Sequence, residues 1–215
     1  RYASRGLGDV YKRQGEHLAI ENNVIADVVV PIPDSGVSAA IGFSQKSKIP
    51  FELGIIRSHY VGRTFIEPSQ NIRQFGVKLK HSVNRSCINN KKVILIDDSI
   101  VRGTTASKIV KMVYEAGAKE VNLGISCPPI LHPDFYGIDT PNYNQLIASK
   151  SNLEEIRKLV GAKSLFFLSL DGTYKAMGCK KRNSKIPQFT DHCFTGEYPI
   201  DVTEILEINR QTNEK

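Results

Sequence analysis

Apolar positions along the chain alternate between short continuous runs and stripes with helical spacing. Apolar runs rich in β-branched residues predict strands at 27–33, 51–57, 93–96, 121–127 and 164–170. Apolar residues with helical spacing predict helices at 36–45, 104–116 and 151–160. Strands that alternate with helices predict an α/β fold with a mainly parallel, twisted sheet and helices on both faces. Ligands of such folds bind at the carboxyl ends of the strands.

Glycines and polar residues mark the ends of two of these helices. Gly117 and Gly161 stand where a left-handed residue commonly ends a helix. Ser151, with Glu154 three residues later, predicts a capping box at the start of the last helix. The segment 58–90 is polar, contains glycine and has no clear period. It predicts a long loop with one short helix, and loops of this length inside a compact domain often act as lids.

Residues 93–105, Val-Ile-Leu-Ile-Asp-Asp-Ser-Ile-Val-Arg-Gly-Thr-Thr, carry the strongest chemical signal. A buried strand ends in two carboxylates, Asp97 and Asp98, and a glycine–threonine turn then opens a helix. Free backbone N–H groups and the positive end of the helix dipole attract an anion to that turn. Neighbouring carboxylates repel one another and call for a divalent cation or sugar hydroxyls. Together these groups indicate a sugar phosphate; a plain helix-capping turn is the alternative interpretation.

Composition narrows the class of protein. The formal net charge of +7 comes from scattered basic residues without a dense block and interleaved aromatics, so no nucleic-acid site is predicted. No apolar run is long enough to cross a bilayer, and no signal peptide pattern is present, so we expect no membrane partner and a cytoplasmic location. The four cysteines have no Cys-x-x-Cys spacing, which disfavours a zinc or redox motif.

The segment 93–105 resembles the phosphoribosyl diphosphate (PRPP) motif of phosphoribosyltransferases. Residues 31–36, 60–70 and 136–139 resemble, in the same order, segments of the glutamine amidophosphoribosyltransferase family. The resemblance runs from about Gly15 to Pro199. It implies the type I phosphoribosyltransferase fold with a flexible lid loop. It also implies transfer of the phosphoribosyl group from PRPP to ammonia, giving 5-phosphoribosylamine and diphosphate in the committed step of purine biosynthesis.

The same resemblance implies roles for individual residues. Catalytic groups would be Arg57, Tyr60 and Arg63, at the base of and within the lid. Magnesium would be held near Ser35, Asp97 and Asp98. The residues implied to bind substrate lie in two loops and are Asp34, Ser35, Gly36, Asp97, Asp98, Ser99, Val101, Arg102, Gly103, Thr104 and Thr105.

The chain also departs from the family pattern. Members that carry an iron–sulfur cluster have a cysteine where this chain has Asp134, and a Cys-x-x-Cys where it has Thr190 to Cys193. Of these three places only Cys193 keeps a thiol here, so no cluster is expected. His17, His81, His132 and His192 have no metal-binding spacing, and we expect them at the surface. The family's glutaminase domain, whose N-terminal cysteine releases ammonia from glutamine, has no counterpart here. We therefore expect a synthase half that uses ammonia.

Three segments are predicted: an uninformative leader or foreign sequence at 1–14, a phosphoribosyltransferase domain at 15–180, and a tail at 181–215 that wraps the domain. The partners implied are PRPP, ammonia, the missing glutaminase domain and further copies of the chain, with purine nucleotides as inhibitors. Two other functions stay open. One is transfer of the phosphoribosyl group to a nucleobase; the other is a non-catalytic regulator that senses PRPP.

Overall fold

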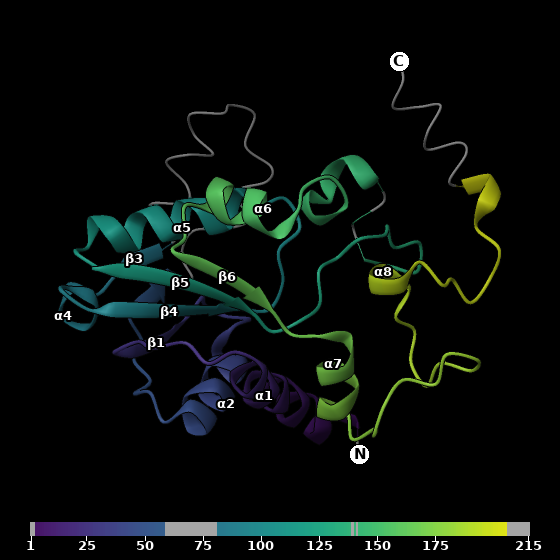
Figure 1. Cartoon of the computed structure of the whole chain (residues 1–215), viewed down its shortest axis with the longest axis horizontal. Helices are drawn as coiled ribbons and strands as arrows, with labels where there is room; N and C mark the ends of the chain where they lie inside the picture. Colours follow the sequence, from purple (N-terminus) through teal and green to yellow (C-terminus); the bar gives the residue numbers. More distant parts are fainter. Residues whose placement is uncertain (1–2, 59–80, 139, 141, 206–215) are drawn as a thin grey trace.

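The computed structural model describes residues 3–58, 81–138, 140 and 142–205. Four parallel strands form the central sheet of these residues (Figure 1). The strands lie in the order β1-β4-β5-β6. Their bounds are Val28–Pro31 for β1, Lys92–Asp97 for β4, Glu120–Ile125 for β5 and Ser164–Phe167 for β6. The predicted mainly parallel α/β sheet is therefore confirmed.

Helices cover both faces of the sheet (Figure 1). One face carries α5 and α6, at Thr104–Glu115 and Leu153–Val160. The other face carries α1, α2 and α7, at Ala3–Glu21, Val37–Ser47 and Leu170–Ala176. This arrangement confirms the layers expected from the alternation of strands and helices.

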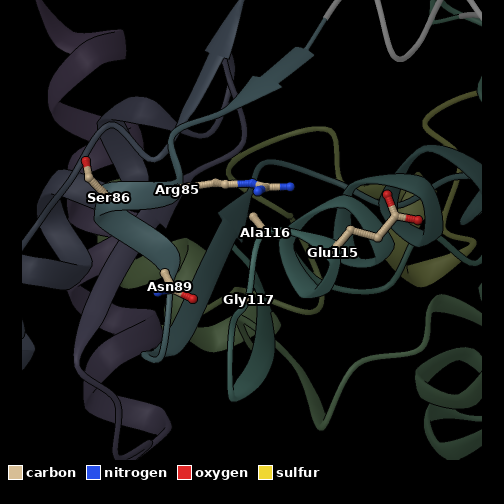
Figure 2. A pocket seen from close by; sticks show the side chains of 6 residues that line it. All are labelled: Arg85, Ser86, Asn89, Glu115, Ala116 and Gly117. Carbon is tan, nitrogen blue, oxygen red and sulfur yellow. The ribbon is translucent and has the colours of Figure 1, made fainter.

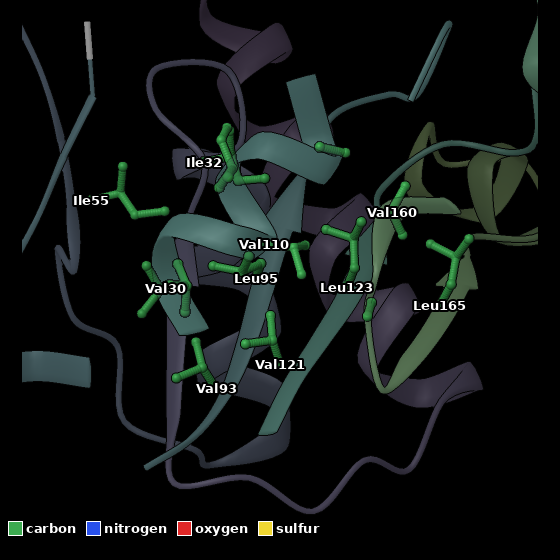
Figure 3. Packing of buried hydrophobic residues seen from close by; sticks show 14 of the residues in the cluster. Val30, Ile32, Ile55, Val93, Leu95, Val110, Val121, Leu123, Val160 and Leu165 are labelled. Carbon is green, nitrogen blue, oxygen red and sulfur yellow. The ribbon is translucent and has the colours of Figure 1, made fainter. Parts of the chain in front are cut away.

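The continuous apolar run of β4 is explained by burial on both faces. Val93 and Leu95 pack in the cluster that faces α5 and α6, which Figure 3 shows. Ile94 and Ile96 pack in a second cluster with residues of α1 and α2. Since side chains of a strand alternate between its faces, a strand covered by helices on both sides must be apolar at every position.

Helix α1 includes most of the leader that the sequence left without an assigned structure. Residues 3–14 are helical and continue without a break through Gly15. At that residue α1 lies directly on α2, because a Cβ atom added to Gly15 would stand 1.8 Å from the carbonyl oxygen of Ala39. Any side chain there would separate the two helices. The boundary proposed between 14 and 15 stays a prediction.

The expected strand at 51–57 is shorter in the structure, and the segment 58–90 contributes a strand besides the short helix that was expected. Only Ile55–Arg57 form β2, which pairs antiparallel with β3 (His81–Val83) outside the central sheet. A short helix, α4, follows at Arg85–Ile88. These elements are too short to give a hydrophobic period. Residues 59–80, where the lid is predicted, lie outside the described residues.

The C-terminal region packs against the segment that follows β5. Its helix α8 spans His192–Thr195. The carbonyl oxygen of Cys193 accepts from the backbone N–H of Leu131, at 2.8 Å, and the Tyr198 hydroxyl donates to the carbonyl oxygen of Pro133, at 2.8 Å. Residues 203–205 are helical. That this tail wraps the whole domain stays a prediction.

The capping box of α6 lies one residue later than predicted. The Asn152 side chain, not that of Ser151, accepts from the backbone N–H of Glu155, at 3.0 Å. The Glu155 carboxylate in turn accepts from the backbone N–H of Asn152, at 2.9 Å. Gly161 ends the helix with φ of 76°, as its position predicted.

Asn152→Ala should lower the free energy of unfolding by about 1 kcal/mol, because it removes the side-chain acceptor of the cap. Ser151→Ala, at the position that the sequence pattern favoured, should change it by no more than a few tenths of a kcal/mol. Urea denaturation of both variants measures the difference. Equal losses in the two variants would contradict this assignment of the cap.

Candidate active site at the carboxyl end of the sheet

Asp97 is the last residue of β4 and is 9% exposed. Burial, followed by the charge of neighbouring Asp98, raises the pKa of Asp97 well above its ordinary value. The backbone N–H of Asp98 donates to the Asp97 carboxylate at 2.9 Å, but this bond does not offset the loss of water. A cation or hydroxyl donors at this position would stabilise the ionised pair.

The loop after β1 lies directly against the end of β4. The backbone N–H of Ile32 donates to the carbonyl oxygen of Ile96, at 2.8 Å. The Ser35 side chain lies close enough to the Asp97 carboxylate to lower its pKa, although burial outweighs this effect. At Gly36 an added Cβ atom would stand 2.2 Å from the Ile96 carbonyl oxygen, so only glycine allows this approach. The fold therefore brings together two loops that are some sixty positions apart in the sequence.

Arg57 connects this loop to the end of β2. Its Nη1 lies 2.6 Å from Oδ2 of Asp34. Both side chains are partly exposed, at 31% and 54%. The Arg57 Nε is buried and has no hydrogen-bond partner among the described residues, so the guanidinium keeps an unused donor. Asp34 therefore holds the Arg57 guanidinium beside the loop that contains Ser35.

The turn between β4 and α5 presents donors for an anion. Gly103 has φ of 75°, a left-handed conformation that permits the sharp entry into α5. Thr104 and Thr105 follow in the first turn of the helix, and both are exposed. Their hydroxyls and the free N–H groups of that turn can bind a phosphate.

A distant segment supports this turn. The backbone N–H of Ile147 donates to the carbonyl oxygen of Val101, at 2.8 Å. Arg102 donates to the side chain of Gln145. The sequence interpretation missed both partners, since the 3-10 turns at Tyr143–Gln145 and Ile147–Ser149 carry no periodic signal.

The structure brings most of the predicted site residues to one edge of the sheet. The loop after β1 contributes Asp34, Ser35 and Gly36, and the segment after β4 contributes Asp97 to Thr105. Tyr60 and Arg63 lie outside the described residues. Two carboxylates and a hydroxyl are oxygen donors of the kind that a hard divalent cation such as Mg²⁺ prefers, so this donor set fits that ion.

Two of the histidines differ from the surface positions that were expected. His81 and His192 are 8% and 4% exposed. His192 Nε2 lies 2.8 Å from Oδ2 of Asp134, a contact between segments 58 residues apart. A spacing rule that considers only nearby residues could not predict it.

A separate hollow of about 460 Å³ lies at the other end of α5 (Figure 2). Its lining residues are Arg85, Ser86, Asn89, Glu115, Ala116 and Gly117. The twelve residues of α5 span about 18 Å, so this hollow is not continuous with the carboxylate site. Among the described helices, none combines the length and apolarity needed to cross a membrane.

Comparison with known proteins identifies relatives over nearly the whole chain. Amidophosphoribosyltransferase of Rhizobium etli is 57% identical over 209 residues, which cover 97% of this chain and 42% of the relative. Amidophosphoribosyltransferase 1, chloroplastic, of Arabidopsis thaliana is 54% identical and covers 89% of this chain and 33% of its own length. No protein-family model matches the chain.

A solved structure agrees with these relatives. Glutamine phosphoribosylpyrophosphate amidotransferase of Bacillus subtilis, complexed with ADP and GMP, matches with a TM-score of 0.82 and 50% identity. The match covers 92% of this chain and 43% of that one. The chain is therefore homologous to amidophosphoribosyltransferases, spans 33–42% of the length of the curated relatives named above, and has the type I phosphoribosyltransferase fold.

Asp97→Asn should stabilise the chain at pH 7. A carboxyl group with a raised pKa keeps its proton longer in the folded state, so stability falls as pH rises above its ordinary pKa of 3.8. The amide carries no charge and avoids this loss. The gain in urea midpoint over the wild type should therefore grow between about pH 4 and pH 7.

Exposed Asp171 supplies the control, since Asp171→Asn should show no gain that grows with pH. An Asp97→Asn midpoint at or below that of the wild type at pH 7 would contradict the conclusion that burial and the charge of Asp98 raise the pKa of Asp97.

Proposed function

We propose that this chain transfers the phosphoribosyl group of PRPP to ammonia, giving 5-phosphoribosylamine and diphosphate for purine biosynthesis. The homology to amidophosphoribosyltransferases supports the class of reaction. One structural observation carries the proposal: the Ser35 loop and the Asp97 carboxylate meet at the same edge of the sheet. PRPP needs such a site because it carries phosphate at one end and diphosphate at the other.

The phosphate on C5 would bind at the turn that opens α5. Backbone N–H groups of residues 101–105 and the hydroxyls of Thr104 and Thr105 are the donors there. Gly103 lets the chain pass close to the phosphate. Arg102, tied to Gln145, is positioned at the same turn. Asp97 and Asp98 would accept hydrogen bonds from the two ribose hydroxyls, directly or through the metal, while Ser99 donates to Asp98 at 3.4 Å.

The diphosphate would lie at the loop Asp34–Gly36. Mg²⁺, when bound near Ser35 and the two aspartates, supplies positive charge that stabilises the leaving diphosphate. Arg57, held by Asp34, adds a positive charge at the same end of the substrate. Tyr60 and Arg63 keep the catalytic roles that the family resemblance implies.

The chemical step requires no strong base. The lone pair of ammonia forms the new C1–N bond as the C1–O bond breaks, and the bonding electrons leave with diphosphate. The surplus proton passes to water. The protein contributes alignment of the two reactants and charge complementary to the departing diphosphate.

The wider assignments follow the relatives. Since a relative was solved with ADP and GMP, we propose that purine nucleotides inhibit the full protein, and that the protein assembles with its own copies. A glutaminase domain would supply ammonia in that protein. The four cysteines are unpaired, which fits a reducing compartment such as the cytoplasm.

The first test measures release of diphosphate from PRPP and Mg²⁺ by the 215-residue chain, with ammonium, glutamine or no nitrogen donor. We expect release with ammonium and little with glutamine. Glutamine hydrolysis needs an activated nucleophile. Burial raises the pKa of the Cys193 thiol to about 11 and that of Cys127 further still, so neither is activated.

The other arms separate the competing functions. Release that depends on a purine or pyrimidine base instead of ammonium would identify a nucleobase phosphoribosyltransferase. PRPP binding without release in any arm would indicate a regulator. Either outcome would overturn the proposed reaction.

Asp97→Asn should lower kcat/KM for PRPP with ammonium about 10-fold to 100-fold, because hydrogen bonds to a charged acceptor contribute about 1.5–3 kcal/mol. The variant is expected to be more stable at pH 7 than the wild type, so unfolding would not explain the loss. Asp171→Asn provides the control and should keep its kcat/KM. A wild-type value for Asp97→Asn would remove Asp97 from the site.

A further inference from the structure

Three side chains from two segments of the chain converge beyond the end of β5. They are Asp134, in the loop after β5, and His192 and Cys193, at the start of α8. Asp134 and His192 side chains are 3% and 5% exposed, and Cys193 is partly buried. None of the three belongs to the proposed PRPP site.

The three potential ligand atoms face one another. Nε2 of His192 lies 2.8 Å from Oδ2 of Asp134 and 3.4 Å from Sγ of Cys193. Sγ of Cys193 lies 3.9 Å from the same Oδ2. In a tetrahedral zinc site with ordinary bond lengths, such N, O and S ligand atoms stand about 3.4–3.6 Å apart. A change of about half an ångström in two of the distances would complete one face of the tetrahedron.

The surroundings of Asp134 direct one of its oxygens toward this point. Its Oδ1 accepts from the backbone N–H groups of Tyr136 and Ile138, at 2.8 Å and 2.9 Å. Oδ2 is therefore left for His192 and Cys193. Hydrogen bonds that fix a carboxylate in this way are typical of the shell around metal ligands.

The histidine does not have the arrangement of a hydrolytic triad. In a triad one ring nitrogen contacts the nucleophile and the other contacts the acid. Here Nε2 makes both contacts, to Asp134 and to Cys193. Nδ1 is buried and has no hydrogen-bond partner among the described residues. A single nitrogen that faces both a carboxylate and a thiol is the arrangement of ligands around one ion.

Aromatic rings pack against the histidine of the cluster. The rings of Tyr136 and Tyr198 lie 4.9 Å and 5.0 Å from that of His192, measured between centroids. Tyr198 also lines a surface hollow of about 500 Å³. The rings reduce contact with water, which strengthens the attraction between an ion and its ligands.

We propose that Asp134, His192 and Cys193 bind one zinc ion, with water in the fourth position. Sulfur, imidazole and carboxylate are all ligands that zinc accepts, whereas Mg²⁺ prefers oxygen alone. Cys193 binds as the thiolate, and its proton passes to the solvent. The ion joins α8 to the segment after β5 and so fastens the C-terminal region to the sheet.

The test uses the 215-residue chain after removal of metals with a chelator. The chain is titrated with Co²⁺ in excess Mg²⁺, which fills sites made of oxygen ligands. We expect one Co²⁺ per chain with the charge-transfer absorption of a cobalt–thiolate bond, and its loss when one equivalent of Zn²⁺ is added. Zn²⁺ alone should raise the melting temperature of the metal-free chain.

Matched variants assign the ligands. Cys193→Ser should bind Co²⁺ without the thiolate absorption, and His192→Gln should lose stoichiometric binding. Cys179→Ser, at a partly buried thiol outside the cluster, should keep both signals. Circular dichroism confirms that each variant is folded, and native mass spectrometry of the wild type counts bound zinc independently of the variants.

Three results would overturn the proposal. They are wild-type protein that binds no stoichiometric Co²⁺ or Zn²⁺, thiolate absorption that persists in Cys193→Ser, and purified protein that contains iron with acid-labile sulfide. The first would leave an ordinary ion pair beside a thiol. The assay measures metal content and spectra, so it is independent of phosphoribosyl transfer.

Discussion

Burial of one carboxylate beside another is the constraint on which the candidate site depends. Asp97 is held at the end of a strand that is apolar on both faces, and Asp98 follows it directly. A fold selected only for stability would avoid this arrangement, because burial destabilises the charge of Asp97 and, among the described residues, no basic side chain offsets it. The free energy lost on folding becomes available to a ligand that supplies positive charge or hydroxyl donors. The Ser35 loop, the Arg57–Asp34 pair and the turn into α5 all lie around this acceptor.

Much of the fold could be predicted because its signals are local. The run 93–96 predicted a strand that is buried on both faces, and Gly161 predicted the end of α6. The elements missed have weak local signals. The first half of α1 contains Gly6 and Gly8, which disfavour helix, and the close packing of α1 on α2 occurs further along, at Gly15. In α7, burial of Tyr174 and its hydrogen bond to Asp191 supply the stability that the short sequence lacks.

In the candidate site, too, residues with local signals could be predicted and residues that depend on distant partners could not. Asp97 and the residues up to Thr105 could be predicted because one continuous segment contains the strand end, the turn and the helix start. The contacts of Gln145 and His192 could not, since each depends on a partner many residues away in the chain. Cys127 lies within electrostatic range of both the carboxylate site and the Asp134–His192–Cys193 cluster. Burial first, and then the charges of Asp98, Asp97 and Cys193, raise the pKa of its thiol. The carboxyl edge of the sheet therefore holds both sites within electrostatic range of one residue.

The antiparallel pair β2–β3 has a consequence for how the family can vary. Arg57 and His81 are direct partners in that pair, so the chain leaves and re-enters the described fold at neighbouring points. When the ends of a connection are fixed together, doubling its length adds only about 0.6 kcal/mol of closure entropy. The pairing of β2 with β3 therefore keeps the anchor of Arg57 in place at the point where this connection begins. Sequence drift, or a protein engineer, can remodel this connection without disturbing the sheet that carries the carboxylates.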